Sequence, residues 1–213
     1  MLTRVVTRPS FGLTGGWGSP KLDLAGCVLY APLWRPDQAG SPFTTKPPVP
    51  HLATVTGALW TPQGRSLDNI NDEITIPAST LFGTSLASAF SMLMWFKPST
   101  VAVATDTLFN TVTGSDGIAL NLNQTNSGKM AGWFYDTGWR TTGETTLTFG
   151  TTKFYHIFLR YDKINFSLII DGVSEASSAQ TGTIAGTSMP LQICSNGGAQ
   201  FAGGIVGEVI LDS

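Results

Sequence analysis

The sequence has few charged residues, and their scarcity excludes several classes of protein. Asp, Glu, Lys and Arg make up 12% of the 213 residues, and the formal net charge is −2. A disordered or solvating protein needs a high net charge and few apolar residues, whereas 42% of this chain is hydrophobic. With this charge the chain lacks the basic surface that nucleic-acid binding requires, and it has no acidic tail. We therefore expect no nucleic-acid partner.

Long apolar runs and export signals are also missing. The longest apolar run, near residues 90–96, is far too short to span a bilayer, so we expect no membrane insertion. The first 18 residues contain arginines but neither an apolar block of signal-peptide length nor a small-residue cleavage site. The sequence therefore predicts a protein that is not exported by the general secretory route.

Cysteine and histidine are scarce, which limits metal and nucleophile chemistry. The only cysteines are Cys27 and Cys194, and the only histidines are His51 and His156. No CxxC or His-rich spacing predicts a zinc site. Without a Gly-x-Ser-x-Gly elbow or a well-placed base, we expect no nucleophilic triad. The two cysteines are interpreted as buried thiols that act as small hydrophobic side chains.

What the chain does contain is a series of short extended segments, clearest in residues 152–172. In the run 166–170, Phe166, Leu168 and Ile170 fall on one face, which is the period of a strand with one buried face. The run 154–161 is apolar on both faces, which predicts a strand covered on both sides. A polar break separates the two runs, and together they predict a β-hairpin.

Similar segments recur along the rest of the chain, with no persistent helical period. Residues 35–50 hold five of the twelve prolines and predict a surface loop, as do the small residues 174–188. Turn residues separate the remaining expected strands, which are 27–34, 54–60, 65–67, 73–76, 89–97, 106–112, 117–123, 129–135, 144–149, 190–195 and 201–211. About a dozen strands at near-regular spacing predict an all-β sandwich.

The hairpin resembles the core hairpin of laminin G-like, concanavalin A-like jelly-roll domains. The likeness lies in an aromatic pair followed by His-Ile, then Arg-Tyr-Asp, and finally Ile-Ile-Asp-Gly. Three further segments of the family are similar to residues 27–33, 64–76 and 191–211. The resemblance implies a two-sheet antiparallel jelly roll over residues 26–213, preceded by an extended arm, residues 1–25. The two ends of such a domain come close together, so a disulfide between Cys27 and Cys194 is an alternative to two thiols.

The arm has two interpretations. It is rich in Gly, Thr, Ser and Pro, which is typical of a loose leader packed against the sandwich. Free leaders seldom expose large apolar side chains, however. The second interpretation is therefore an arm that orders on a partner protein, with Arg4, Arg8, Phe11 and Trp17 as docking residues.

One stretch has the residue types of a sugar site. Residues 132–140 contain Trp133, Tyr135, Asp136, Trp139 and Arg140, which combine aromatic platforms with hydrogen-bonding groups. We expect Trp139 in a glycine-bounded surface loop. The alternative is a Trp139 ring folded back over the end of the sandwich. We expect Trp60, Trp95 and Phe96 in the core. A polar sheet face is expected to carry Asn110, Asn121, Asn123 and Gln124. This face either binds a ligand or is simply exposed to solvent.

Calcium is the one metal that the sequence suggests. Laminin G-like and legume lectin-like domains often hold this ion at loop tips, and Asp68, Asn71 and Asp72 cluster in one expected turn. Hard oxygen ligands of this kind suit calcium. The same residues also close ordinary turns by bonding to their own backbone, and we favour that interpretation.

Catalytic carboxylates are not expected. Glycosidases need two carboxyl groups about 5–10 Å apart, but Glu208 and Asp212 are four residues apart on one expected strand, or about 13 Å. The Glu-x-Asp-x-x-Glu signature of the resembling β-glucanases is absent. The resemblance gives His156 a structural role, with its ring bonded to a neighbouring strand.

These features predict a non-catalytic binding or structural module. The leading hypothesis is a virion surface protein, such as a phage capsid decoration or tail protein, attached to a protein partner through its arm. The alternative is a carbohydrate-binding, calcium-dependent module of a larger cell-surface protein. In either case the domain faces outward, on a virion or a cell, and self-association into a homo-oligomer stays open.

Overall fold

The computed structural model describes residues 26–99, 105–111, 116–122, 128–186, 189–197 and 200–213. The expected arm, with Arg4, Arg8, Phe11 and Trp17, lies outside the described residues. Within the described part of the chain, no helix combines the length and the apolar character that crossing a membrane requires.

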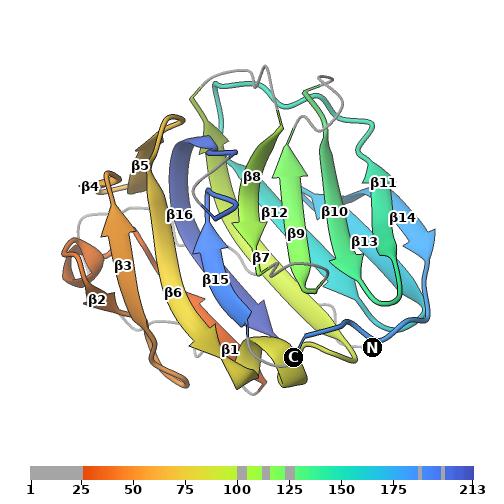
Figure 1. The fold of residues 1–213 in the computed structure, drawn as a ribbon. Coiled ribbons are helices and arrows are strands. Elements are labelled where there is room, and N and C mark those ends of the chain that lie inside the picture. The colour runs from red at the N-terminus through yellow and green to blue at the C-terminus, as the bar shows by residue number, and fades with distance from the viewer. Residues whose placement is uncertain (1–25, 100–104, 112–115, 123–127, 187–188, 198–199) are drawn as a thin grey trace, which may run out of the picture.

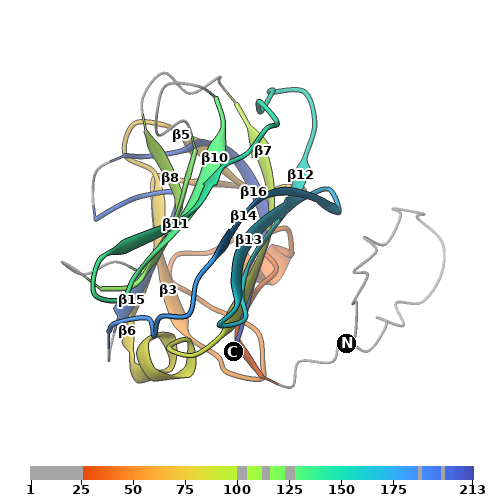
Figure 2. The same ribbon diagram turned by 90° about the vertical axis from the view of Figure 1, so that its right-hand side faces the viewer.

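The described residues form two antiparallel β-sheets that pack face to face, as the two views show (Figures 1 and 2). Sheet 1 contains, in spatial order, β14 (Val173–Ala179), β13 (Asn165–Ile170), β12 (Tyr155–Tyr161), β7 (Phe90–Pro98), β16 (Gly203–Asp212), β5 (Gly64–Asp68) and β4 (Leu59–Thr61), with β1 (Cys27–Ala31) paired to β16. Sheet 2 contains β11 (Trp139–Glu144), β10 (Met130–Tyr135), β9 (Ile118–Leu122), β8 (Asp106–Asn110), β15 (Met189–Ile193), β6 (Glu73–Ser79), β3 (Leu52–Thr56) and β2 (Phe43–Thr44). Two short helical turns, η1 (Pro36–Gln38) and η2 (Leu81–Ser85), complete the described elements. The predicted two-sheet sandwich is confirmed.

The hairpin of β12 and β13 lies inside sheet 1, as the sequence predicts. The two strands pair antiparallel, and β12 also pairs with β7. Phe166, Leu168 and Ile170 are buried, which confirms the period of the second run. The first run differs from the prediction, because its burial alternates and only one face of β12 is covered. Its outer face carries His156 and Phe158, which are half-buried on an uncovered sheet.

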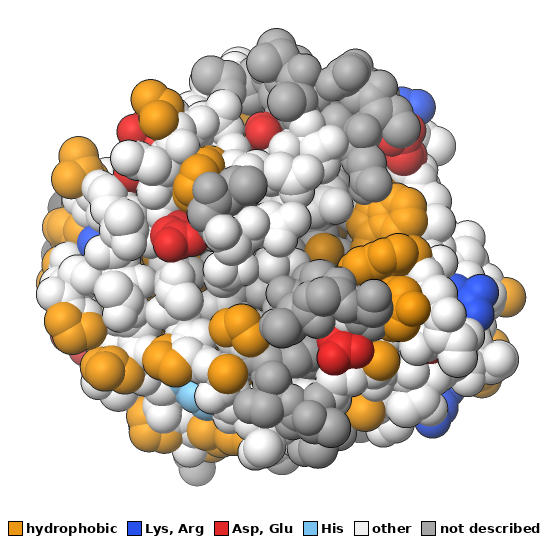
Figure 3. Space-filling model, viewed as in Figure 1, with side chains coloured by type: hydrophobic (Ala, Val, Ile, Leu, Met, Phe, Trp, Pro, Cys, Tyr) orange, Lys and Arg blue, Asp and Glu red, His pale blue; other side chains and the backbone are white. Residues whose placement is uncertain are grey.

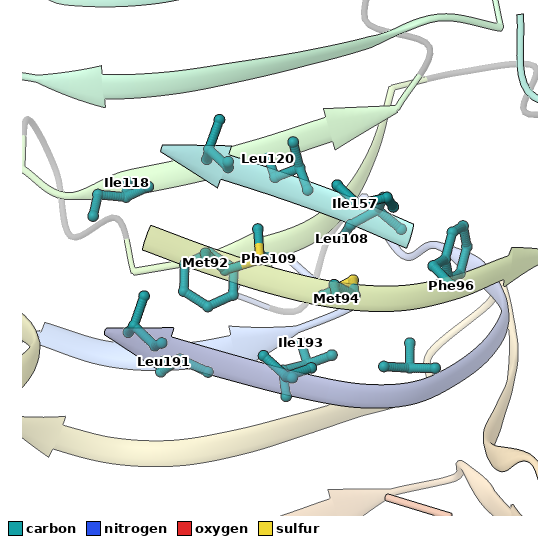
Figure 4. Close-up of a cluster of buried hydrophobic side chains, with 14 of the residues drawn as sticks. Met92, Met94, Phe96, Leu108, Phe109, Ile118, Leu120, Ile157, Leu191 and Ile193 are labelled. Carbon is teal, nitrogen blue, oxygen red and sulfur yellow. The ribbon is translucent and has the colours of Figure 1, made fainter. Parts of the chain in front are cut away.

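The core lies between the inner faces of the two sheets. Figure 4 shows side chains of β7 among those of β8, β9, β12 and β15. At one end of this core, the Phe166 ring lies 5.0 Å from the Phe134 ring in an edge-to-face arrangement and 6.2 Å from the ring of Phe90. Because Phe134 belongs to sheet 2 and the other two rings belong to sheet 1, this aromatic cluster joins the two layers.

Three expected segments differ from the observed strands. The expected strand 54–60 is two strands, β3 and β4, which lie in different sheets and are separated by Gly57 with φ +72°. The expected loop 174–188 begins with β14, a strand at the edge of sheet 1. A strand at the edge of a sheet needs little apolar alternation. Because β14 consists mainly of small and polar residues, the sequence did not indicate a strand there. The expected strand 144–149 begins at the last residue of β11, and residues 145–149 are not a strand.

The two cysteines do not form a disulfide. Cys27 and Cys194 are both buried and free. The Sγ of Cys27 donates a hydrogen bond to the carbonyl of Leu29 at 3.1 Å. Burial raises the pKa of the Cys27 thiol to about 11. The interpretation as buried thiols is the one that the structure supports.

A buried carboxyl group in β8 should make the stability of the fold depend on pH. Asp106 is 7% exposed, and burial raises its pKa from 3.8 to about 6. Between these two values the unfolded chain releases a proton that the folded chain keeps, so the free energy of unfolding falls as pH rises from about 4 to 6. We expect Asp106→Asn to abolish this fall and to stabilise the fold at pH 7 by about 2 kcal/mol, measured by urea unfolding across this pH range.

Asp162 provides a control of opposite sign. Backbone N–H groups of Asn165 and Ile164 lower its pKa, so its contribution is present above the unfolded pKa and is lost as pH falls. Asp162→Asn should therefore destabilise the fold at pH 7. An Asp106→Asn variant less stable than the natural chain at pH 7 would contradict the assignment.

The aromatic cluster should dominate the stability of the sandwich. Phe166 is completely buried, so Phe166→Ala should lower the free energy of unfolding by about 3–5 kcal/mol through lost burial and a residual cavity. Ile164, in the preceding turn, is 67% exposed. Ile164→Ala should change the same quantity by less than about 0.5 kcal/mol. Equal effects of the two substitutions in urea unfolding would show that the cluster is not the core.

Candidate functional site

The outer face of sheet 2 carries a row of side chains that crosses five strands. The register pairs Gln192 with Asn110, Asn110 with Ala119, Ala119 with Trp133 and Trp133 with Thr141. Paired residues of antiparallel strands point to the same side of the sheet. The neighbours of Trp133 along β10 face the core, so the whole row faces outward.

Three aromatic side chains gather at one end of this row. Tyr135 pairs with Trp139 in the β10–β11 hairpin, and Tyr135 lies two residues from Trp133 on the same face of β10. The rings of Tyr135 and Trp139 are 5.3 Å apart and nearly perpendicular, at 78°. Trp139 is 46% exposed, which is unusual for a tryptophan. Figure 3 shows hydrophobic side chains gathered over β10 and β11 on this face.

The predicted loop around Trp139 is a tight hairpin. Trp139 is the first residue of β11, and the turn spans only residues 136–138. The alternative prediction, a Trp139 ring folded over the end of the sandwich, is wrong, because the register places this ring on the outer face of sheet 2 beside Tyr135. A strand fixes the direction of a side chain more firmly than a loop does.

Trp133 has an unusual polar group. Its side chain is half-buried, and its indole Nε1 is buried without a hydrogen-bond partner among the residues that the structure describes. A buried donor left unpaired costs about 1–3 kcal/mol, and such groups are rare in folded proteins. The small side chain of Ala119 lies opposite Trp133 on the adjacent strand. Because the nitrogen is buried, the face presents the ring of Trp133 and not its N–H group.

Amide side chains lie at the other end of the row, where Asn110 is 2% exposed and Gln192 is half-buried. Asn110 Nδ2 donates to Gln192 Oε1 at 2.9 Å and to Asn196 Oδ1 at 3.3 Å. Asn196 Nδ2 in turn donates to Gln200 Oε1 at 3.0 Å. This network holds several amide groups in fixed orientations before any ligand arrives. We call the surface the aromatic–amide face, and it consists of Asn110, Ala119, Trp133, Tyr135, Trp139 and Gln192.

Asp136 and Arg140 do not share this face. Arg140 pairs with Phe134, whose side chain is in the core, so Arg140 lies on the opposite side of β11 from the three aromatic residues. Its Nε contacts Asp136 Oδ1 at 3.0 Å and Oδ2 at 3.1 Å. A ligand role for these two residues stays a prediction.

The Asp136 carboxylate braces the tip of the hairpin. Burial raises its pKa, but the hydrogen bonds from Arg140 and from the turn N–H groups outweigh that effect, so its pKa is below the usual value. A Cβ on Gly182 would lie 2.1 Å from Asp136 Oδ2, so only glycine allows this close approach. Backbone hydrogen bonds from Tyr135 to Gly117 and from Ala185 to Tyr135 hold the end of β10 as well.

The suggested calcium ligands form a turn that binds its own backbone. Asp68 Oδ1 accepts hydrogen bonds from the N–H groups of Ile70 and Asn71, and Asp72 Oδ2 accepts one from the N–H of Asp68 at 2.9 Å. Asp72 is 6% exposed, whereas the side chain of Asn71 is exposed. These are the bonds of the favoured turn interpretation. Among the described residues, no group of three or more His, Cys, Asp or Glu side chains could hold a metal ion.

The groups considered for catalysis have structural partners. The Tyr30 phenol is hydrogen-bonded to Glu208, and burial together with this carboxylate raises the pKa of Tyr30. His51 Nε2 lies 2.9 Å from the carbonyl of Val28. The His156 ring lies 4.8 Å from the ring of Trp95 with the two planes tilted by 47°, and its Nε2 is buried without a partner among the described residues. The expected bond from the His156 ring to a neighbouring strand stays a prediction.

Some residues lie elsewhere than the sequence predicted, and some residues of the amide network were not predicted at all. Trp60 and Trp95, expected in the core, are half-buried, while Phe96 is fully buried as predicted. Asn123 and Gln124 lie outside the described residues. Gln192, Asn196 and Gln200 were missed because nothing local to their segment indicates that it joins β8. The alternation of Gln192 between two apolar residues was the only available signal.

The turn assignment can be tested against the calcium hypothesis. Asp72→Ala removes the buried acceptor of the Asp68 N–H and should destabilise the fold by about 1–3 kcal/mol, whereas Asn71→Ala should have little effect. The melting temperature should not change when EDTA replaces added calcium. A melting temperature that falls in EDTA, and no longer does so in Asp72→Ala, would instead establish a calcium site at this turn.

Comparisons with known proteins agree with this architecture. The family model described as the concanavalin A-like lectin/glucanases superfamily matches residues 68–211, which is more than half of the chain. No curated protein matches the sequence.

Solved structures with the same fold come from several proteins. Domain 4 of AbnA, a GH43 extracellular arabinanase from Geobacillus stearothermophilus solved with arabinotriose, has a TM-score of 0.71 at 17% identity, over 88% of this chain and 92% of that chain. Trypanosoma rangeli sialidase has a TM-score of 0.63 at 17% identity, over 88% of this chain but 30% of the sialidase.

A toxin domain is similar as well. The binding domain of botulinum neurotoxin DC, in complex with SialylT, has a TM-score of 0.65 at 9% identity, over 88% of this chain and 47% of that chain. At such low identities these structures show a shared fold and nothing more. The family match over residues 68–211, together with the two-sheet sandwich, shows that the chain belongs to the concanavalin A-like lectin/glucanases superfamily.

Proposed function

We propose that this domain is a non-catalytic carbohydrate-binding module whose ligand lies on the aromatic–amide face of sheet 2. The observation that carries the proposal is the convergence of three aromatic rings and a fixed amide network on one sheet face. Aromatic rings stack on the apolar faces of sugars, and amides exchange hydrogen bonds with sugar hydroxyls.

The geometry supplies both parts of such a site. Trp139 offers an exposed ring, and Tyr135 holds that ring from the side. Trp133 adds a half-buried ring to the same face. Because all three aromatic residues belong to strands, little conformational entropy is lost when a ligand binds.

The similar proteins support the same class of ligand. Domain 4 of the arabinanase was solved with arabinotriose, and the toxin binding domain with SialylT. Cell entry of a further similar protein, botulinum neurotoxin type C, depends on interaction with two ganglioside molecules. A carbohydrate-binding role therefore has more support than the virion surface role, which stays a prediction, as does attachment of the arm to a protein partner.

The proposal predicts which tryptophans matter for binding. Trp139→Ala and Trp133→Ala should each weaken glycan binding by about 1–3 kcal/mol, or roughly 5- to 150-fold, because each removes a ring from the face. A glycan array identifies a bound sugar, and titration calorimetry then gives the affinities of the natural chain and its variants. Circular dichroism checks that each variant is folded.

Trp95→Ala is the matched control. Trp95 lies on the outer face of sheet 1, where its ring contacts that of His156, so its replacement should leave the affinity unchanged. Loss of binding in Trp95→Ala with retention in Trp139→Ala would move the site to sheet 1. An array without any bound glycan would remove the proposed function.

A further inference from the structure

We infer that the aromatic–amide face selects neutral oligosaccharides and rejects sugars that carry a carboxylate, such as sialic and uronic acids. The inference rests on the proposed function and adds the class of ligand. It follows from where the chain places its cations.

Most of the described cations belong to sheet 1 or to loops far from the aromatic–amide face. Lys97 and Arg160 lie on strands β7 and β12, and Lys153 and Lys163 flank β12. Arg35 and Lys46 both bind Asp37. Arg65 is buried and donates to backbone carbonyls, which include that of Ala58 at 3.2 Å.

The two cations nearest in sequence to the aromatic residues are also turned away or distant. Arg140 lies on the opposite side of β11 and is held by Asp136. Lys129 precedes β10 at the end opposite Tyr135, so it is four residues, or about 13 Å, from Trp133 along the strand. The loops outside the described residues, 100–104, 112–115, 123–127, 187–188 and 198–199, contain no Lys, Arg or His. The remaining three cations belong to residues 1–25.

Acidic groups, by contrast, border this side of sheet 2. Glu144 pairs with Ala131 on β10, Glu73 pairs with Thr56 on β3, and Asp116 precedes β9. Figure 3 shows acidic side chains within this face and basic ones only toward the margins of the view. A sugar carboxylate placed here would lose hydration, meet like charge and find none of the described cations beside it.

Neutral sugars face none of these costs. The polar groups of the face include carboxamides, which exchange hydrogen bonds with hydroxyl groups without any charge. The similar structures solved with ligands do not indicate whether this chain prefers neutral or acidic sugars, because their identity to it is too low. The inferred preference comes instead from the charges of the described residues.

The test uses the full chain and pairs of glycans that differ only in an acidic sugar. Lactose is compared with sialyllactose, and neutral xylo-oligosaccharides with their glucuronic acid-substituted forms, first on an array and then by calorimetry. We expect each neutral partner of a bound pair to bind at least tenfold more tightly than its acidic counterpart. Trp133→Ala should weaken binding of the neutral partner by the roughly fivefold or more expected above.

A charge substitution provides an independent measurement. Thr141 pairs with Trp133 on the same face, so Thr141→Arg adds a cation beside the indole. This variant should raise the affinity for the acidic partner at least threefold, and added salt should cancel the gain.

The outcomes separate the two proposals. Equal or tighter binding of the acidic partner by the natural chain would overturn the inference and leave the proposed function standing. Undiminished binding of the neutral partner by Trp133→Ala would also overturn it, because another surface would then hold the sugar. Absence of binding to every glycan would remove the proposed function and the inference with it.

Discussion

Exclusion of water from the space between the two sheets is the constraint on which the rest of the structure depends. In a strand, successive side chains point to opposite faces. Phe134 must enter the aromatic cluster with Phe166 and Tyr161, so its neighbours on β10 must point outward. Those neighbours are Trp133 and Tyr135. The packing of the core therefore sets the direction of the rings that form the proposed binding face.

The same constraint explains which parts of the molecule the sequence could predict. Residues 166–170 alternate cleanly, because their outer face is open to solvent, and that prediction holds. In β14 no apolar alternation marks the strand, since an edge strand packs on one side only. Trp139 was expected in a loop because glycine lies on each side of it in sequence, at positions 138 and 143. The glycine positions indicated where a turn lies but not how many residues it spans.

The site was less predictable than the fold. The three aromatic residues lie within seven positions of one another, so one stretch of sequence indicated them. The amides come from distant parts of the chain: Asn110 and Gln192, which bond to each other, are 82 residues apart. No local pattern specifies that β15 pairs with β8. Such a contact becomes visible only once the order of strands in sheet 2 is known. Asp136 and Arg140 were grouped with the aromatic residues by proximity in sequence, although strand alternation places Arg140 on the other face.

The contrast between two tryptophans explains why one sheet face, and not the other, suits a sugar. Both Trp95 and Trp139 lie on outer faces of sheets, but Trp95 is half-buried and its ring contacts His156 within its own sheet. Trp139 contacts Tyr135 edge to face and keeps 46% of its surface exposed. A sugar needs the flat surface of a ring, together with fixed polar groups beside it. Sheet 1 also carries Lys97 and Arg160 on its outer face, so both charge and ring exposure distinguish the two surfaces. The sandwich thus separates a charged outer face on one sheet from an aromatic and amide-rich one on the other, and only the second offers a neutral glycan an unoccupied ring.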